Sequence, residues 1–143
     1  MPPWREKAAQ MFPELTSVIN DAADSYSLWG DLLDTFNCAY GPPRDESLIK
    51  RVYEYADWCI DQPQGKTAED DLTTCVAVTF YEHIPQHSDV RADMPRWFTL
   101  EDLLGMEKLF RYHISDTEFE ALKQYFSEHR DMYVDRFRKT SRN

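Results

Sequence analysis

Basic residues and glycine are scarce in this chain, and each shortage excludes a class of function. The 143 residues include 16 Lys and Arg against 26 Asp and Glu, so the formal net charge is −10. Sequence-independent binding to nucleic acid needs a basic surface that displaces counterions from phosphates, and the charge argues against it. The four glycines are too few and too far apart to form a phosphate-binding loop or a dinucleotide fingerprint.

Long apolar runs and paired cysteines are absent as well. No stretch approaches the roughly 18 uninterrupted apolar residues of a membrane span, and residues 1–7 lack the apolar core of a secretory signal. We therefore expect a soluble, cytoplasmic protein that does not contact a membrane. Cys38, Cys59 and Cys75 are odd in number and widely spaced, which predicts reduced, buried thiols.

Apolar residues at helical spacing are what the chain has in abundance. Leu28, Leu32, Phe36 and Tyr40 step by four residues, and similar patterns occupy most of the sequence. We predict an all-α fold, one compact domain over residues 1–143 with about five to seven helices. Residues 1–13 are expected to be an extension or a short helix, and residues 139–143 a flexible basic tail.

The middle of the chain carries one ambiguous segment. The β-branched residues of Cys75–Tyr81 suit a buried strand, but Leu72, Val76, Phe80 and Ile84 form another four-residue ladder, which favours a buried helix ended by Pro85. The expected helices at 45–61 and 71–84 resemble one hairpin of a HEAT-like stack. Residues 86–96 are expected to form a polar connection.

Two helix starts in the last third of the chain are marked by capping patterns. Thr99 precedes Asp102 by three residues, and Ser115 precedes Glu118 by three. The last helix should have one apolar face. Its members are Phe119, Leu122, Phe126, His129, Tyr133 and Phe137.

No pattern of catalytic or metal-binding residues emerges. His83 and His87 have the spacing of a helical metal pair, but Pro85 between them breaks the turn that would align them. Cys59 lies between Asp57 and Asp61, and negative neighbours raise the pKa of a thiol. The sequence predicts no catalytic residue, metal or cofactor, and favours half-buried structural roles for His113 and His129.

One cluster has the composition of an interface hot spot, which is rich in aromatic residues and arginine. We predict that it binds a partner. Its members are Tyr81, Glu82, His83, Arg91, Arg96 and Trp97. The structural alternative is that Trp97 and Phe98 form an apolar staple at the entrance to the next helix.

Charge is distributed unevenly along the chain. Residues 14–34 contain five carboxylates and no Lys or Arg, and residues 54–71 contain six carboxylates and only Lys66. A surface of one sign raises the association rate of an oppositely charged partner. Residues 130–142 are net positive.

Four strings of residues resemble those of an uncharacterised family of small bacterial helical proteins. They are LIKRVYEYADWCI (48–60), VAVTFYEHIP (76–85), DMPRWFTLEDL (93–103) and FRYHISDTEFEAL (110–122), which contain YxxAxWC, FYEH and P-x-W motifs. The likeness covers residues 28–126. It implies an all-helical fold and a bacterial, cytoplasmic setting, and it brings no catalytic residues.

These observations favour a non-catalytic, acidic interaction module that binds another protein with a basic surface, for example in the manner of an immunity protein or an antitoxin. The first alternative is an enzyme of unrecognised type that uses the region of Glu82, His83, Arg91 and Arg96. The second is a nucleic-acid mimic whose carboxylates stand in for phosphates.

Overall fold

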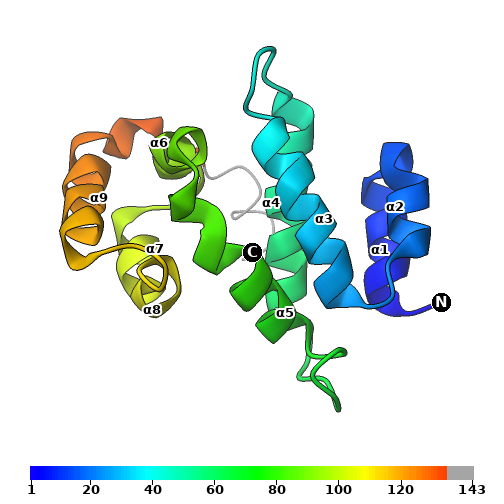
Figure 1. Ribbon diagram of the computed structural model, residues 1–143. Helices are drawn as coiled ribbons and strands as arrows, with labels where there is room; N and C mark the ends of the chain where they lie inside the picture. The colour runs from blue at the N-terminus through cyan, green and yellow to red at the C-terminus, as the bar shows by residue number, and fades with distance from the viewer. Residues whose placement is uncertain (135–143) are drawn as a thin grey trace. The chain divides into compact units, whose positions relative to one another are not determined.

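The computed structural model describes residues 1–134, and all regular structure in that range is helical (Figure 1). Residues 139–143, and with them the expected basic tail, lie outside the described residues. The prediction of an all-α fold is confirmed for the part described. Nine α-helices occur there, more than the five to seven expected, because α2, α7 and α8 are single short turns of four to six residues.

The chain divides into two compact units, which we call unit 1 (residues 1–80) and unit 2 (from residue 81). The helices of unit 1 are α1 (Pro3–Met11), η1 (Pro13–Leu15), α2 (Thr16–Asp21), α3 (Ser25–Cys38), α4 (Glu46–Ile60) and α5 (Leu72–Thr79). Those of unit 2 are η2 (Tyr81–Gln86), α6 (Ser88–Trp97), α7 (Leu100–Gly105), α8 (Glu107–Phe110), α9 (Asp116–Glu128) and η3 (Arg130–Met132).

The core of unit 1 is aromatic. Trp29 of α3 is fully buried between Tyr55 of α4 and Phe80, with ring centroids 5.3 and 4.8 Å apart in two stacked pairs. Phe36, two turns along α3, meets the edge of Phe80 at 5.1 Å. Large rings bury much apolar area at little conformational cost, so these contacts fix how α3, α4 and α5 pack.

Helix α4 has the wide apolar stripe that the sequence predicts for 45–61. Asp45 caps it by accepting a hydrogen bond from the Leu48 amide at 3.1 Å. The Tyr55 hydroxyl of α4 donates a hydrogen bond to the Trp4 carbonyl of α1 at 2.9 Å, and this bond attaches α1 to α4. Residues 3–11 are thus a short helix, packed through the buried Trp4 and Ala8.

The predicted helix at 71–84 is correct for its first two turns and wrong beyond them. α5 ends at Thr79, and η2 then runs from Tyr81 through Pro85 with 3₁₀ geometry. Proline lacks an amide hydrogen and its ring crowds the carbonyl four residues earlier, so the α-helix cannot continue to Ile84. α4 and α5 do pack against each other, as a helical hairpin requires.

The prediction of a polar connection over 86–96 is wrong, because Ser88–Trp97 forms helix α6. Its buried residues Val90, Met94 and Trp97 repeat every three to four residues. The polar residues between them and Pro95 in the last turn conceal this stripe, and the proline removes only one hydrogen bond near the helix end.

Both predicted capping boxes are confirmed. The Thr99 hydroxyl accepts from the Asp102 amide at 3.0 Å, and the Asp102 carboxylate accepts from the Thr99 amide at 2.8 Å. Ser115 and Glu118 exchange the same pair of bonds at 3.0 and 3.1 Å. The bonds from the Ser115 backbone and hydroxyl hold the pKa of Glu118 below its ordinary value.

The last helix ends earlier than its apolar stripe predicts. α9 stops at Glu128, and a ring nitrogen of His129 lies 2.8 Å from the Tyr125 carbonyl oxygen. That carbonyl would accept the residue-129 amide in a continuing helix. His129 therefore terminates the helix instead of extending it, and Phe137 lies outside the described residues.

Alanine substitutions at two glycines of unit 1 should have opposite effects on stability. A Cβ at Gly30 in α3 meets nothing within 4 Å, whereas one at Gly65 overlaps the backbone of Asp70 and Asp71. We expect Gly30→Ala to raise the free energy of unfolding by about 0.5–1 kcal/mol. Gly65→Ala should lower it by about 1 kcal/mol or more. Chemical denaturation measures both, and a gain in stability from Gly65→Ala would contradict the loop geometry.

Candidate functional site

The six residues predicted to bind a partner all lie in η2 and α6 of unit 2, but they are not equally accessible. Tyr81 and Trp97 are buried, with 5% and 1% of their surface exposed. Glu82, His83, Arg91 and Arg96 are half-buried. The two large aromatic residues are placed as core residues, so any contact with a partner falls mainly to the other four.

Asp93 organises the C-terminal half of α6. Its carboxylate is 5% exposed and accepts hydrogen bonds from Arg96 Nε at 2.6 Å and Nη2 at 3.1 Å, and from Trp97 Nε1 at 3.0 Å. The Arg96 guanidinium also lies over the Trp97 ring, 5.1 Å from its centroid. Arg96 and Trp97 are thus held by contacts within α6, which is a structural role.

Arg91 is also engaged within unit 2. Its Nε donates to the Pro85 carbonyl at 2.5 Å, and its Nη2 lies 3.6 Å from Glu118 Oε2. The pair lines one end of an open groove of about 320 Å³ between α6 and α9. Arg91 and Arg96 thus have partners of their own, separate from the surroundings of His83.

Glu82 and His83 meet two residues that the sequence reasoning did not connect with them. The His83 and His113 rings stack with centroids 4.4 Å apart and planes 19° apart. His113 Nε2 lies 3.5 Å from Glu82 Oε1, and the Tyr112 ring packs edge-on against His113 at 4.9 Å. We call Glu82, His83, Tyr112 and His113 the histidine cluster. No group of three metal-ligating side chains is placed to hold an ion in residues 1–134.

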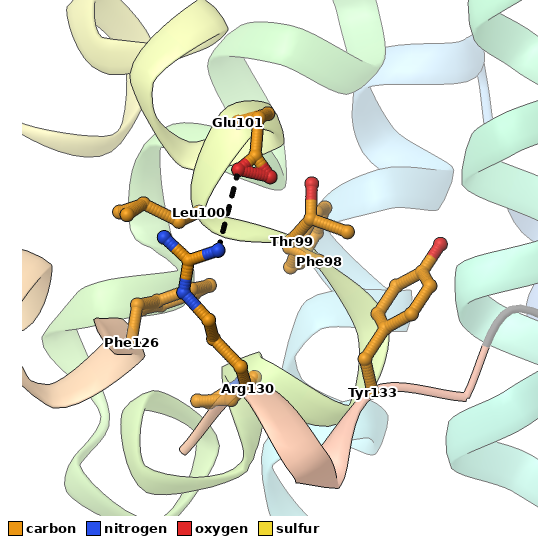
Figure 2. A pocket seen from close by; sticks show the side chains of 8 residues that line it. Phe98, Thr99, Leu100, Glu101, Phe126, Arg130 and Tyr133 are labelled. Atoms are coloured by element: carbon orange, nitrogen blue, oxygen red, sulfur yellow. Dashed lines mark ion pairs between the residues drawn. The ribbon is translucent and has the colours of Figure 1, made fainter. Parts of the chain in front are cut away.

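A small pocket lies between α6, α7 and the end of α9 in unit 2 (Figure 2). It has a volume of about 130 Å³, and the buried rings of Phe98 and Phe126 contribute to its apolar wall. Figure 2 shows the Arg130 guanidinium facing the Glu101 carboxylate, 3.9 Å away, with Tyr133 beside the opening. Both charged groups are largely exposed, so their ion pair contributes little to stability.

The main feature of unit 1 is its negative charge. Apart from Glu6 and Asp45, eight of its carboxylates form no ion pair with any residue in the range 1–134. They are Asp21, Asp24, Asp31, Asp34, Asp61, Glu69, Asp70 and Asp71. We call these eight residues the acidic surface.

Part of the acidic surface converges where α3 and α5 begin, at one end of unit 1 (Figure 1). The pKa of Tyr26 is raised above its ordinary value, mainly by burial. Smaller contributions come from Cys75, Asp71 and Glu69. Asp24 and Asp71 likewise contribute to the raised pKa of Cys75, after desolvation. The carboxylates of Asp24, Glu69 and Asp71 therefore act on the neighbouring side chains of Tyr26 and Cys75.

The three thiols differ from the sequence prediction at one position. Cys59 and Cys75 are buried as expected, but Cys38 is exposed at the C-terminal end of α3. Cys38 does lie in a helix, as predicted, but it falls on the solvent-exposed side of α3, the side that carries Asp31 and Asp34. Burial raises the pKa of Cys59 to about 12, so this thiol stays protonated and is a poor nucleophile.

Nothing matches this chain among family models, curated proteins or solved structures. The resemblance to the family of small bacterial helical proteins stays a prediction. No helix in residues 1–134 has the length and apolar character needed to cross a bilayer.

Removing the Asp93 carboxylate should destabilise unit 2. Asp93→Ala leaves the Arg96 guanidinium and the Trp97 indole N–H without their acceptor, and we expect a loss of about 2–4 kcal/mol in the free energy of unfolding. Asp89→Ala, which removes an exposed carboxylate from the first turn of the same helix, is the control and should cost well under about 1 kcal/mol. Equal effects of the two variants in denaturant titrations would show that Asp93 does not organise α6.

Thiol labelling should separate Cys38 from the other two cysteines. In the folded protein we expect one thiol to react rapidly with an aromatic disulfide reagent, and all three to react after denaturation, because only Cys38 is exposed. Cys38→Ser should abolish the rapid phase. Rapid labelling of Cys59 in the folded Cys38→Ser variant would contradict the burial described above.

Proposed function

We propose that this protein is a non-catalytic interaction module whose acidic surface binds a basic surface of another protein. The observation that carries the proposal is the set of eight carboxylates in unit 1 without a cationic partner. Unit 1 as a whole has 14 Asp and Glu against 6 Lys and Arg, a net charge of −8.

The basic side chains of unit 1 are largely occupied by other groups. Arg51 forms a two-pronged pair with Glu14, at 2.8 and 2.6 Å, and also donates to the Met11 carbonyl. Lys50 pairs with Glu54, and Arg44 with Glu46. Arg5 donates to the Ala22 carbonyl. Three of the six cations of unit 1 therefore neutralise carboxylates outside the acidic surface, and no ion pair within residues 1–134 compensates the negative charge of that surface.

An uncompensated field of one sign acts on a partner before contact. It raises the rate of association with a basic protein and suppresses acidic competitors, and its effect weakens as salt screens it. Exposed carboxylates of this kind add little to folding stability. An immunity protein or antitoxin that neutralises a basic toxin is one form of this function, and a bacterial, cytoplasmic setting belongs to the same proposal.

The proposal is tested by neutralising four exposed members of the acidic surface whose side chains cap no helix: Asp31→Asn, Asp34→Asn, Asp61→Asn and Glu69→Gln. The matched control makes the same charge change in unit 2, with Glu101→Gln, Glu120→Gln, Glu128→Gln and Asp131→Asn. Wild-type protein captures partners from a lysate of its host, and calorimetry with the purified partner then measures the affinity of all three forms.

We expect the unit 1 variant to bind at least about tenfold more weakly than wild type, and the control less than about threefold more weakly. The affinity of the wild type should fall steadily as salt rises from low to moderate concentration. A partner with an acidic surface, or equal losses in the two variants, would refute the proposal. Competition by DNA for the partner would support the nucleic-acid mimic. Salt-independent turnover of a small molecule that depends on Glu82 would support the enzyme.

A further inference from the structure

We propose that the histidine cluster of unit 2 binds the guanidinium group of an arginine side chain carried by a protein. The site belongs to unit 2, whereas the acidic surface that carries the proposed function belongs to unit 1. It is defined by Glu82, His83, Tyr112 and His113. Three observations support it: an open aromatic ring, a poorly satisfied carboxylate and a pair of stacked planar rings.

Tyr112 is an unusually exposed aromatic residue. It has 69% of its surface accessible, whereas most other large apolar side chains in residues 1–134 are buried. Its ring forms a T-shaped pair with the His113 ring, and most of the Tyr112 side chain faces solvent. An exposed tyrosine ring attracts a cation through the negative potential of its face.

Glu82 supplies the negative charge. Its side chain is only 13% exposed, and the His113 Nε2 atom lies 3.5 Å from its Oε1 atom, a distance too long for a strong hydrogen bond. A carboxylate removed from water needs donors to offset its lost hydration. A guanidinium offers two parallel N–H groups that match the two carboxylate oxygens.

The stacked imidazoles of the histidine cluster should favour arginine over lysine as the bound side chain. The rings of His83 and His113 are nearly parallel, and the His83 orientation is fixed by a 2.7 Å contact between Nδ1 and Gln86 Oε1. A flat guanidinium can add to such a stack, whereas the compact ammonium of lysine cannot.

Arg111 directly precedes Tyr112 in the sequence, but its side chain is held by other groups. Arg111 pairs with Glu107 and Asp116 and lies over the Phe119 ring at 5.5 Å. Arg111 is therefore not the guanidinium that the cluster would bind.

The test uses the full chain and three small probes at about pH 8: the N-acetyl amides of arginine, lysine and citrulline. Citrulline has the shape of arginine without its charge. Binding is followed by NMR through the ring signals of His83, His113 and Tyr112. We expect saturable shifts with the arginine probe, at least about threefold weaker binding of lysine, and no saturable binding of citrulline.

Variants locate the site. Tyr112→Ala and Glu82→Gln should each weaken arginine binding by about threefold or more, and Tyr112→Phe should retain it because the ring remains. Leu104→Ala, which removes another exposed apolar side chain of unit 2, should have no effect. Equal binding of arginine and lysine, shifts that map elsewhere, or unchanged binding by Tyr112→Ala would overturn the proposal. Failure here leaves the salt-dependent binding of the acidic surface untouched, since the four carboxylates varied to test it lie in unit 1.

Discussion

The stacking of Trp29 between Tyr55 and Phe80 is the interaction on which the rest of unit 1 depends. It joins α3, α4 and the end of α5 in one place, with no solvent contact at Trp29. Once the faces of α3 that carry Leu28, Trp29 and Leu32 are turned inward, Asp31 and Asp34 must face water. The acidic surface is in this sense a consequence of the aromatic core.

Unit 2 is organised by a polar group as well as by apolar packing. A buried carboxylate is costly unless several donors surround it. Asp93 has three donor atoms within 3.1 Å, from Arg96 and Trp97. It therefore fixes the indole of Trp97 and the guanidinium of Arg96 together. The same arrangement withdraws Arg96 from any role that would need a free cation.

Features set by neighbours in sequence could be predicted, and features set by tertiary contacts could not. The capping boxes of Thr99 and Ser115 depend on residues three apart in the sequence. The wide apolar stripe of α4 depends on the spacing of residues within that one helix. Residue spacing was therefore sufficient to predict both features. The end of α9 depends on the ring of His129 competing for a backbone carbonyl, which spacing does not encode. Pro85 correctly indicated that the helix ends, but α5 ends at Thr79, six residues before the proline, and not at Ile84.

The candidate site shows the same division. Glu82 and His83 were selected from composition, yet His113 and Tyr112 lie some 30 residues away and meet them only because η2 packs against α8. Asp93 carried a signal that was missed, since it precedes Arg96 by three residues and Trp97 by four on one helix. Burial of Tyr81 and Trp97 could not be read from their residue types, because aromatic residues are equally typical of cores and of interfaces.

The acidic surface and the histidine cluster would recognise positive charge by different physics. Carboxylates that remain in water act over about a Debye length, roughly 8 Å at physiological salt. They affect the rate of association with a partner more than the rate of dissociation. A carboxylate that is mostly removed from water interacts strongly, but only with a donor of matching shape. Glu82 is of the second kind, and the open ring of Tyr112 beside His113 provides the apolar contact that interface hot spots combine with a buried charge. Salt should therefore weaken binding at the acidic surface much more than binding at the histidine cluster. Ions in solution screen the field of exposed charges, but they screen a charge pair that is largely buried much less.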